Sequence, residues 1–292
     1  MAPQLAVNTD YDVGYGSPLP SIRQVAEAGF TSIIWGHQWD TDFLYSPSEV
    51  AAIAACLEQQ RVTLVDLHGT SGVEKCWYSP VEYERLAGVE LVRNRIEMTA
   101  RLGGDAVVLH PMVCEPDALA ELRAQGLKSL QELEAVARNR GVLLALENLF
   151  GSERTKHPDG GRQCFDTIEY FFECFPPDYL GFCWDTGHCL ILGDDALERG
   201  AALARGRLRA LHLNDNRGRD DLHSPPLTWS DCWEFVAATI AESPYPADKP
   251  LAFEVNANPN DVEPEAFLNE VYRKALVFDE LVQRRRAGAL EG

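Results

Sequence analysis

Residues 142–149 read VLLALENL, residues 179–185 read YLGFCWD and residues 208–215 read LRALHLND, and these three runs indicate the fold. Each is a short stretch of apolar, β-favouring residues with a polar side chain at or near its end. Segments with helical periodicity separate them, and strict alternation of strand and helix is typical of parallel sheets. Further runs of this kind occur at residues 5–8, 31–36, 62–69, 105–111 and 250–256. The chain therefore contains eight candidate strands.

The segments between these strands have the periodicity of amphipathic helices, and many close with glycine, as a helix C-cap would. Examples are SPSEVAAIAACLEQQ, PVEYERLAGVELVRNRIEMTARLGG and LKSLQELEAVARNRG. A doubly wound open sheet is the competing architecture, but the first strand is followed only by GYG at residues 14–16, not by GxGxxG. We therefore predict an α/β fold, a single (β/α)8 TIM barrel that spans residues 1–292 as one domain. Roughly the last eight residues, within RRRAGALEG, are expected to be a frayed tail.

Composition excludes several classes of partner. Lys plus Arg number 26 against 45 Asp plus Glu, and the formal net charge of -19 disfavours binding to nucleic acid. No stretch approaches the ~18 apolar residues of a membrane span, and the N-terminus lacks a signal-peptide pattern. The eight cysteines show no CxxC spacing, which favours reduced thiols. We expect a cytoplasmic protein with no nucleic-acid or membrane partner.

Polar residues at the ends of the predicted strands are the strongest functional signal. Parallel strands are normally apolar, and the carboxyl ends of barrel strands are where active sites are built. A single polar residue there would more often belong to a loop, but six of them together indicate a site. The six are His68, His110, Glu147, Asp185, His212 and Glu254.

Side-chain alternation predicts that the last four of these residues point into the barrel mouth, because residues i and i-2 of a strand share a face. Small residues occupy those lower positions: Ala145, Cys183, Ala210 and Ala252. Three carboxylates that converge in a cleft need a cation, because mutual repulsion would otherwise force protonation. Two Glu, one Asp and one His suit a divalent metal ion, with Mn²⁺ expected first and Mg²⁺, Co²⁺ or Zn²⁺ as alternatives. The competing interpretation is that some of the carboxylates pair with Arg154, Arg217 or Arg219 in surface salt bridges.

At these same residues the sequence resembles the xylose isomerase-like TIM-barrel superfamily, which includes sugar phosphate isomerases/epimerases, ketose 3-epimerases and endonuclease IV type enzymes. The resemblance runs nearly end to end. Its motifs are LALEN around Glu147, CWDTGH at 183–188, LHLND at 211–215, DLHSPP at 221–226 and FEVN in the last strand.

The resemblance implies a role for each matching position. Glu147, Asp185, His212 and Glu254 would be the four ligands of one catalytic metal, and His188 would contact substrate. Glu153 matches a substrate-binding Glu of the ketose 3-epimerases. Arg217 lies one position closer to the metal His than the substrate Arg of that group, so its match is imperfect.

The resemblance to endonuclease IV extends to the positions of that enzyme's nine ligands for three zinc ions, and the residue type agrees at each one. The nine are His68, His110, Glu147, Asp185, His188, His212, Asp221, His223 and Glu254. The negative charge of the chain and the absence of evident basic loops argue against DNA repair.

The sequence therefore predicts an enzyme of carbohydrate metabolism, a divalent-metal-dependent sugar isomerase or epimerase. Glu147 and Glu254 would act as base and conjugate acid, while the metal stabilises an enediolate. Substrate contacts are expected from the histidines of the site and from an aromatic ring of the WGHQWD segment. These candidates are His188, His68, His110, His223 and, first among the aromatics, Trp35.

Alternatives remain open at this point. A metal-dependent lyase or dehydratase acting on a keto-inositol or related keto sugar needs the same enolate stabilisation, and carbon-glycoside cleavage is a variant of it. A non-catalytic binding barrel would bind ligand without turnover. The expected partner is a small sugar or polyol, and related barrels suggest a homodimer or homotetramer.

Overall fold

Strands and helices alternate along the chain, in the order that the sequence predicts. The computed structural model describes residues 3–114, 116–151, 160–257 and 263–289. The strands are β1 (Leu5–Asn8), β2 (Ser32–Trp35), β3 (Thr63–His68), β4 (Ala106–Leu109), β5 (Leu143–Glu147), β6 (Leu180–Asp185), β7 (Leu208–His212) and β8 (Leu251–Phe253). The helices are α1 (Leu19–Glu27), α2 (Pro47–Gln60), α3 (Glu82–Leu102), α4 (Leu119–Arg140), α5 (Gly160–Cys174), α6 (Thr186–Leu192), α7 (Asp194–Arg207), α8 (Trp233–Glu242) and α9 (Pro264–Ala289).

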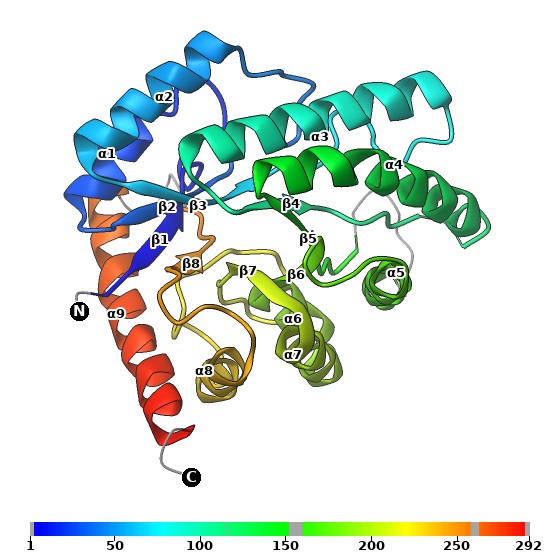
Figure 1. The fold of residues 1–292 in the computed structure, drawn as a ribbon. Coiled ribbons are helices and arrows are strands. Elements are labelled where there is room, and N and C mark those ends of the chain that lie inside the picture. The colour runs from blue at the N-terminus through cyan, green and yellow to red at the C-terminus, as the bar shows by residue number, and fades with distance from the viewer. Residues whose placement is uncertain (1–2, 115, 152–159, 258–262, 290–292) are drawn as a thin grey trace.

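The strands form one parallel sheet that curls into a barrel, with the helices outside it (Figure 1). Their order is β7-β6-β5-β4-β3-β2-β1-β8, and each neighbouring pair is parallel. The two ends of this order meet through Leu213, directly after β7. Its N–H donates to the carbonyl of Ala252 at 3.0 Å, and its carbonyl accepts from the N–H of Glu254 at 3.2 Å. The predicted single (β/α)8 TIM barrel is confirmed.

Several strands are shorter than the predicted runs, but the polar residues expected at their carboxyl ends lie at the last strand residue or directly after it. Glu147, Asp185 and His212 are the last residues of β5, β6 and β7. His110 and Glu254 follow β4 and β8 directly. All of these side chains therefore lie at the carboxyl-terminal mouth of the barrel.

The helix ends follow ordinary capping chemistry. Ser46 and Glu49 form a reciprocal capping box at the start of α2, with proline in the first turn. The left-handed glycines that the sequence predicts as C-caps are present at Gly103 after α3 and Gly141 after α4. Arg61 ends α2 in the same conformation, with φ 57°, although it is not a glycine.

The final helix is longer than the sequence suggested. α9 runs to Ala289 and packs against α8 and α1, so that it covers the junction between the last and first strands (Figure 1). The basic residues expected in a frayed tail are partly held: Arg285 donates to Glu234 at 2.7 Å and Arg286 to the carbonyl of Ala247 at 3.1 Å. Fraying there is opposed by helical hydrogen bonds and these contacts.

The apolar core has two parts. Most of it fills the layer between the strands and the surrounding helices. A second, separate cluster of four buried residues consists of Val108, Ala145, Cys183 and Ala210. These residues come from β4, β5, β6 and β7, and each lies two positions before a polar residue of the mouth. The barrel therefore keeps a layer of small side chains directly below its polar mouth.

Two further expectations concern thiols and membranes. No disulfide joins any of the eight cysteines within the described ranges. Among those same residues, no helix combines the length and the apolarity that crossing a bilayer requires.

The loop after β7 is held in place by one buried carboxylate. Asp215 accepts hydrogen bonds from the backbone N–H groups of Thr228 and Trp229, at 2.9 and 2.8 Å, and from the indole N–H of Trp233 at 3.2 Å. The segment between these anchors carries Asp221 and His223. Asp215 thus fixes the loop that brings those two side chains over the mouth.

Replacing Asp215 with Asn tests this anchor. The amide loses the charge and turns one acceptor oxygen into a donor that faces other donors, so we expect a loss of about 2–3 kcal/mol in the free energy of unfolding. Chemical denaturation measures it. Asp231→Asn is the control, because Asp231 is exposed on the same loop and its change is expected to stay within about 0.5 kcal/mol. Equal stability of both variants would contradict the role of Asp215.

Candidate metal centre and active site

Four side chains from four strand ends converge at the floor of the barrel mouth. Glu147, Asp185, His212 and Glu254 each offer one ligand atom, and these atoms all lie within 4.8 Å of one another. Nδ1 of His212 is 3.3 Å from Oε2 of Glu147 and 3.1 Å from Oε2 of Glu254. Three of the four residues are buried, and Glu254 is partly buried. The structure thus brings together the four residues that the sequence predicts as metal ligands.

Several donor atoms at this floor and beside it lack hydrogen-bond partners. Buried polar atoms are nearly always paired, so each exception needs an explanation. The buried atoms without a partner in the described part of the chain include Glu147 Oε2, His212 Nδ1, His68 Nδ1 and His110 Nε2. Carboxylate and imidazole donors in this arrangement fit a divalent ion such as Mn²⁺, Co²⁺ or Zn²⁺, and Mg²⁺ less well because of the histidine.

Two asparagines hold Asp185 in position. The side chain of Asn148 pairs with the backbone of Asp185, donating to its carbonyl at 2.8 Å and accepting from its N–H at 3.0 Å. Asn214 donates to Oδ2 of Asp185 at 2.8 Å. Gly187 in the DTGH turn has to be glycine, because a Cβ there would collide with the Asn214 side chain. The motif residues that flank the ligands therefore orient them.

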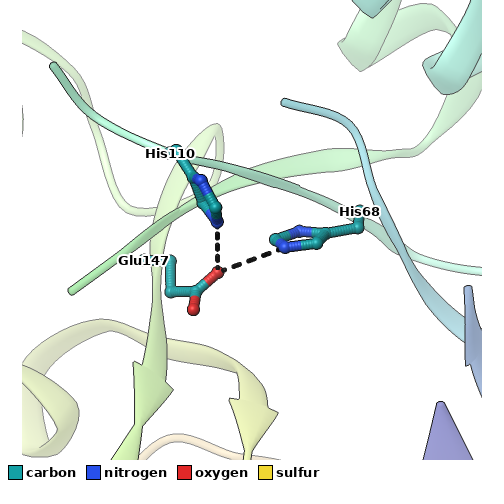
Figure 2. A group of neighbouring side chains, drawn as sticks. All are labelled: His68, His110 and Glu147. Carbon is teal, nitrogen blue, oxygen red and sulfur yellow. Dashed lines mark ion pairs between the residues drawn. The ribbon is translucent and has the colours of Figure 1, made fainter. Parts of the chain in front are cut away.

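A second cluster shares Glu147 (Figure 2). Nε2 of His110 and Nε2 of His68 lie 3.3 and 3.8 Å from Oε2 of Glu147. Figure 2 shows both rings directed at that oxygen from β3 and from the residue after β4. Both histidines line the pocket.

A third cluster lies above the floor and consists of His188, Asp221 and His223. Oδ2 of Asp221 is 3.5 Å from Nε2 of His188 and 3.1 Å from Nε2 of His223. His223 has φ 45°, a left-handed conformation that is uncommon outside glycine. Strained backbone of this kind often accompanies function, and here it lets the ring face Asp221.

Burial and neighbouring charges set the ionisation of the floor. Burial raises the pKa of Asp185 to about 7. Burial also acts to raise the pKa of Glu147 and Glu254, but the neighbouring histidines, His212 foremost, together outweigh it and hold the pKa of Glu147 well below its usual range and that of Glu254 at about 2. Burial acts to lower the pKa of His212, yet the neighbouring Cys183 and Glu254 raise it well above normal. Without a metal, protons on imidazole therefore supply the positive charge that these carboxylates need.

A pocket of about 410 Å³ opens above the floor. Trp39 forms part of its wall, with its ring centre 5.1 Å from that of His68 and 5.2 Å from that of His110. The lining residues are Asn8, Asp10, Trp39, His68, His110, Glu147, Leu149, Phe150, Gly151, His188, Asp221, His223, Glu254 and Asn256. This volume lies in the range of small-molecule sites, about 300–1,000 Å³.

Two predicted substrate contacts, Trp35 and Arg217, do not line this pocket. Trp35 is only 1% exposed, and its indole N–H donates to the carbonyl of His37, so it supports the loop while Trp39 reaches the pocket. Arg217 is exposed, with its guanidinium carbon 3.7 Å from the ring centre of Trp229. Glu153 lies outside the described residues.

The sequence prediction also missed two acids. Asp10 lines the pocket beyond β1 and accepts from the side chain of Asn8 at 2.9 Å; burial and the nearby Glu254 raise its pKa. Asp66 lies in β3 and is fully buried, two residues before His68. Strand alternation would have found Asp66, because a charged residue there shares the face of His68.

The chain is similar to known proteins over most of its length. The profile of the xylose isomerase-like TIM barrel matches residues 22–273. The uncharacterized protein y4fM of Sinorhizobium fredii is 26% identical over 94% of this chain and 92% of its own length. A probable endonuclease 4 of a Geobacillus species is 28% identical over 66% of this chain and 67% of its own.

Solved structures share the fold. A D-tagatose 3-epimerase-like protein superposes with a TM-score of 0.71 at 21% identity, covering 97% of this chain and 99% of the other. The profile match extends from α1 into α9 and so includes Glu147, Asp185, His212 and Glu254. The chain belongs to the xylose isomerase-like TIM-barrel family.

Proposed function

We propose that the protein is a divalent-metal-dependent isomerase or epimerase of a small sugar or sugar derivative. The observation that carries the proposal is the set of buried, unpartnered donors of Glu147 and His212 beside Asp185 and Glu254, at the floor of a closed-in pocket. The tagatose 3-epimerase-like neighbour supports the reaction class by analogy only. Mn²⁺ is the ion we propose first.

The reaction would move a proton on a carbon next to a carbonyl group. Glu147 and Glu254 both approach Nδ1 of His212, at 3.3 and 3.1 Å, and both line the pocket. One carboxylate would remove the proton from carbon, and the other, in its protonated form, would return one to the neighbouring carbon or to the opposite face. A bound divalent ion would act as a Lewis acid that lowers the energy of the enediolate.

Other residues would bind and orient the substrate. His68 and His110 present ring nitrogens to the pocket and would hydrogen-bond hydroxyl groups. Burial and the neighbouring His110 lower the pKa of His68 to about 3, so its ring is neutral and can donate or accept. Trp39 offers an indole face of the kind that stacks on the apolar side of a sugar.

Removal of the metal gives the first test. The melting temperature is measured with Mn²⁺ and again after EDTA treatment.

Two pKa shifts predict how this effect depends on pH. Burial acts to lower the pKa of His223, but Asp221 and Glu254 raise it to about 9. The stability that the proton of His223 contributes is therefore complete below about pH 6.5 and is lost as pH rises through about 9. The raised pKa of Asp185, about 7, also removes stability as pH rises from about 4 through 7.

Both pKa shifts make the metal-free protein less stable at pH 9 than at pH 6. At pH 9, fewer protons also compete with Mn²⁺ for the ligand atoms. We therefore expect Mn²⁺ to raise the melting temperature more at pH 9, with a stabilisation of about 2.7 kcal/mol at a hundredfold excess over Kd. The carboxylates with lowered pKa titrate below this window. A Mn²⁺ effect that is absent, or larger at pH 6, would contradict the proposed site.

Isotope exchange tests the chemistry. The Mn²⁺-loaded protein is incubated in D₂O with a panel of ketoses, keto-inositols and 3-keto glycosides, and NMR detects deuterium next to the carbonyl. Glu147→Gln and Glu254→Gln keep the side-chain size but cannot exchange protons, and we expect each to slow incorporation by about 10²–10⁴-fold. Glu173→Gln, an exposed change on α5, is the control. Exchange that survives both Gln variants would exclude these residues as the acid and base.

The same experiment separates an isomerase from a lyase. An isomerised product has the mass of the substrate, whereas dehydration lowers it by one water. Carbon-glycoside cleavage would release two products.

A second candidate function is phosphodiester cleavage at abasic DNA. The specific observation in its favour is that all nine positions matching the zinc ligands of endonuclease IV fall into three clusters around the mouth. The formal charge of -19 and the small pocket oppose it. Cleavage of an abasic-site oligonucleotide, without deuterium exchange on the sugar panel, would favour this function instead.

A further inference from the structure

An unpartnered carboxylate lies inside the barrel, below the floor of the pocket. Asp66 of β3 is 0% exposed, and neither of its oxygens has a hydrogen-bond partner in the described ranges. It does not line the pocket. Its Oδ1 is 4.0 Å from Nε2 of His212, which comes from β7 on the far side of the barrel. Asp66 therefore points across the interior.

A buried carboxylate without hydrogen bonds destabilises a fold, and an apolar side chain of similar size would pack at lower cost. The ammonium of Lys249 does not pair with it, because that group donates to Asp105 and to the carbonyl of Arg209 at 2.5 and 2.7 Å. His212 is the polar side chain that Asp66 faces at ion-pair distance. Packing alone thus gives no reason for a carboxylate here.

The two ring nitrogens of His212 face different partners. Nδ1 faces Glu147 and Glu254 at the floor, and Nε2 faces Asp66. A histidine that binds a metal through one nitrogen usually presents its other N–H to a carboxylate or carbonyl, which fixes the tautomer and makes the ligand nitrogen more basic. Within the described residues, the thiol of Cys183 also hydrogen-bonds the ring of His212, but a thiol is a weaker acceptor than a carboxylate, and Asp66 is the carboxylate that faces Nε2.

We propose that Asp66 is a positioning residue for His212: its carboxylate attracts the Nε2 proton, so that Nδ1 keeps its lone pair directed at the floor. The inference rests on the proposed function, because it assigns a role toward the metal. At 4.0 Å the contact is too long for a hydrogen bond, and the carboxylate acts as a charge on the N–H dipole of the neutral ring through the low dielectric of the interior. Asp66 contacts neither substrate nor metal.

The proposal predicts opposite changes in two properties. Replacing Asp66 with Leu removes an unpaired buried charge, so the denaturation midpoint of the metal-free protein should stay unchanged or rise. The same change removes the field on Nε2, so the Kd for Mn²⁺ should increase about 10- to 100-fold. Asp66→Asn keeps an acceptor oxygen without the charge, and its Kd should lie between those of wild type and Asp66→Leu.

The experiment measures Mn²⁺ binding by calorimetry and urea denaturation of the metal-free chain, both at pH 8. Val108→Ala is the matched control, because Val108 belongs to the small interior cluster. It should lower the denaturation midpoint and leave the Kd unchanged.

Each other result overturns the inference. An unchanged Kd in both Asp66 variants would mean that Asp66 does not position His212, while the proposed metal site would stand. Weaker Mn²⁺ binding accompanied by a lower denaturation midpoint of the metal-free chain would assign Asp66 a purely structural role. A wild-type chain that binds no Mn²⁺ would exclude both the proposed function and the role of Asp66.

Discussion

The structure depends on one electrostatic constraint, because carboxylates of like charge converge at a buried site. Glu147, Asp185 and Glu254 meet around His212 at the end of the barrel strands, where water cannot screen them. Carboxylates at this separation need a positive charge between them, supplied either by protonated imidazoles or by a metal ion. The unpartnered donor atoms of Glu147 and His212 are consistent with the second source.

The rest of the fold keeps these charges in place. Parallel pairing aligns the carboxyl ends of β5 to β8 at one mouth, and the small cluster beneath them leaves room for the ligands. Asn148 and Asn214 fix Asp185, and Asp215 anchors the loop that carries Asp221 and His223. Rigid elements therefore hold the first contacts to a metal or substrate, as a precise site requires.

Much of this arrangement could be predicted from the sequence, because side chains alternate between the two faces of a β-strand with a fixed period of two residues. Apolar runs that end in polar residues predicted the eight strands. The alternation of side chains along a strand predicted that Glu147, Asp185 and His212 point into the mouth. Loop conformation could not be predicted in the same way. Trp35 ends β2, and Trp39 lies in the irregular segment that follows it. The spacing of the two residues does not show which ring faces the pocket, and in the folded chain it is the ring of Trp39. Arg217 stacks on Trp229, a contact that spacing does not encode.

Anomalous diffraction from crystals soaked in Mn²⁺ tests the central claim most directly. The account predicts an anomalous peak within ligand distance of Glu147, Asp185, His212 and Glu254, at about 2.0–2.3 Å from each donor atom. Additional peaks at the clusters of His68 with His110 and of Asp221 with His223 would extend the centre to the three-ion arrangement. An empty floor, with His212 hydrogen-bonded to Glu147 and Glu254 instead, would contradict the account.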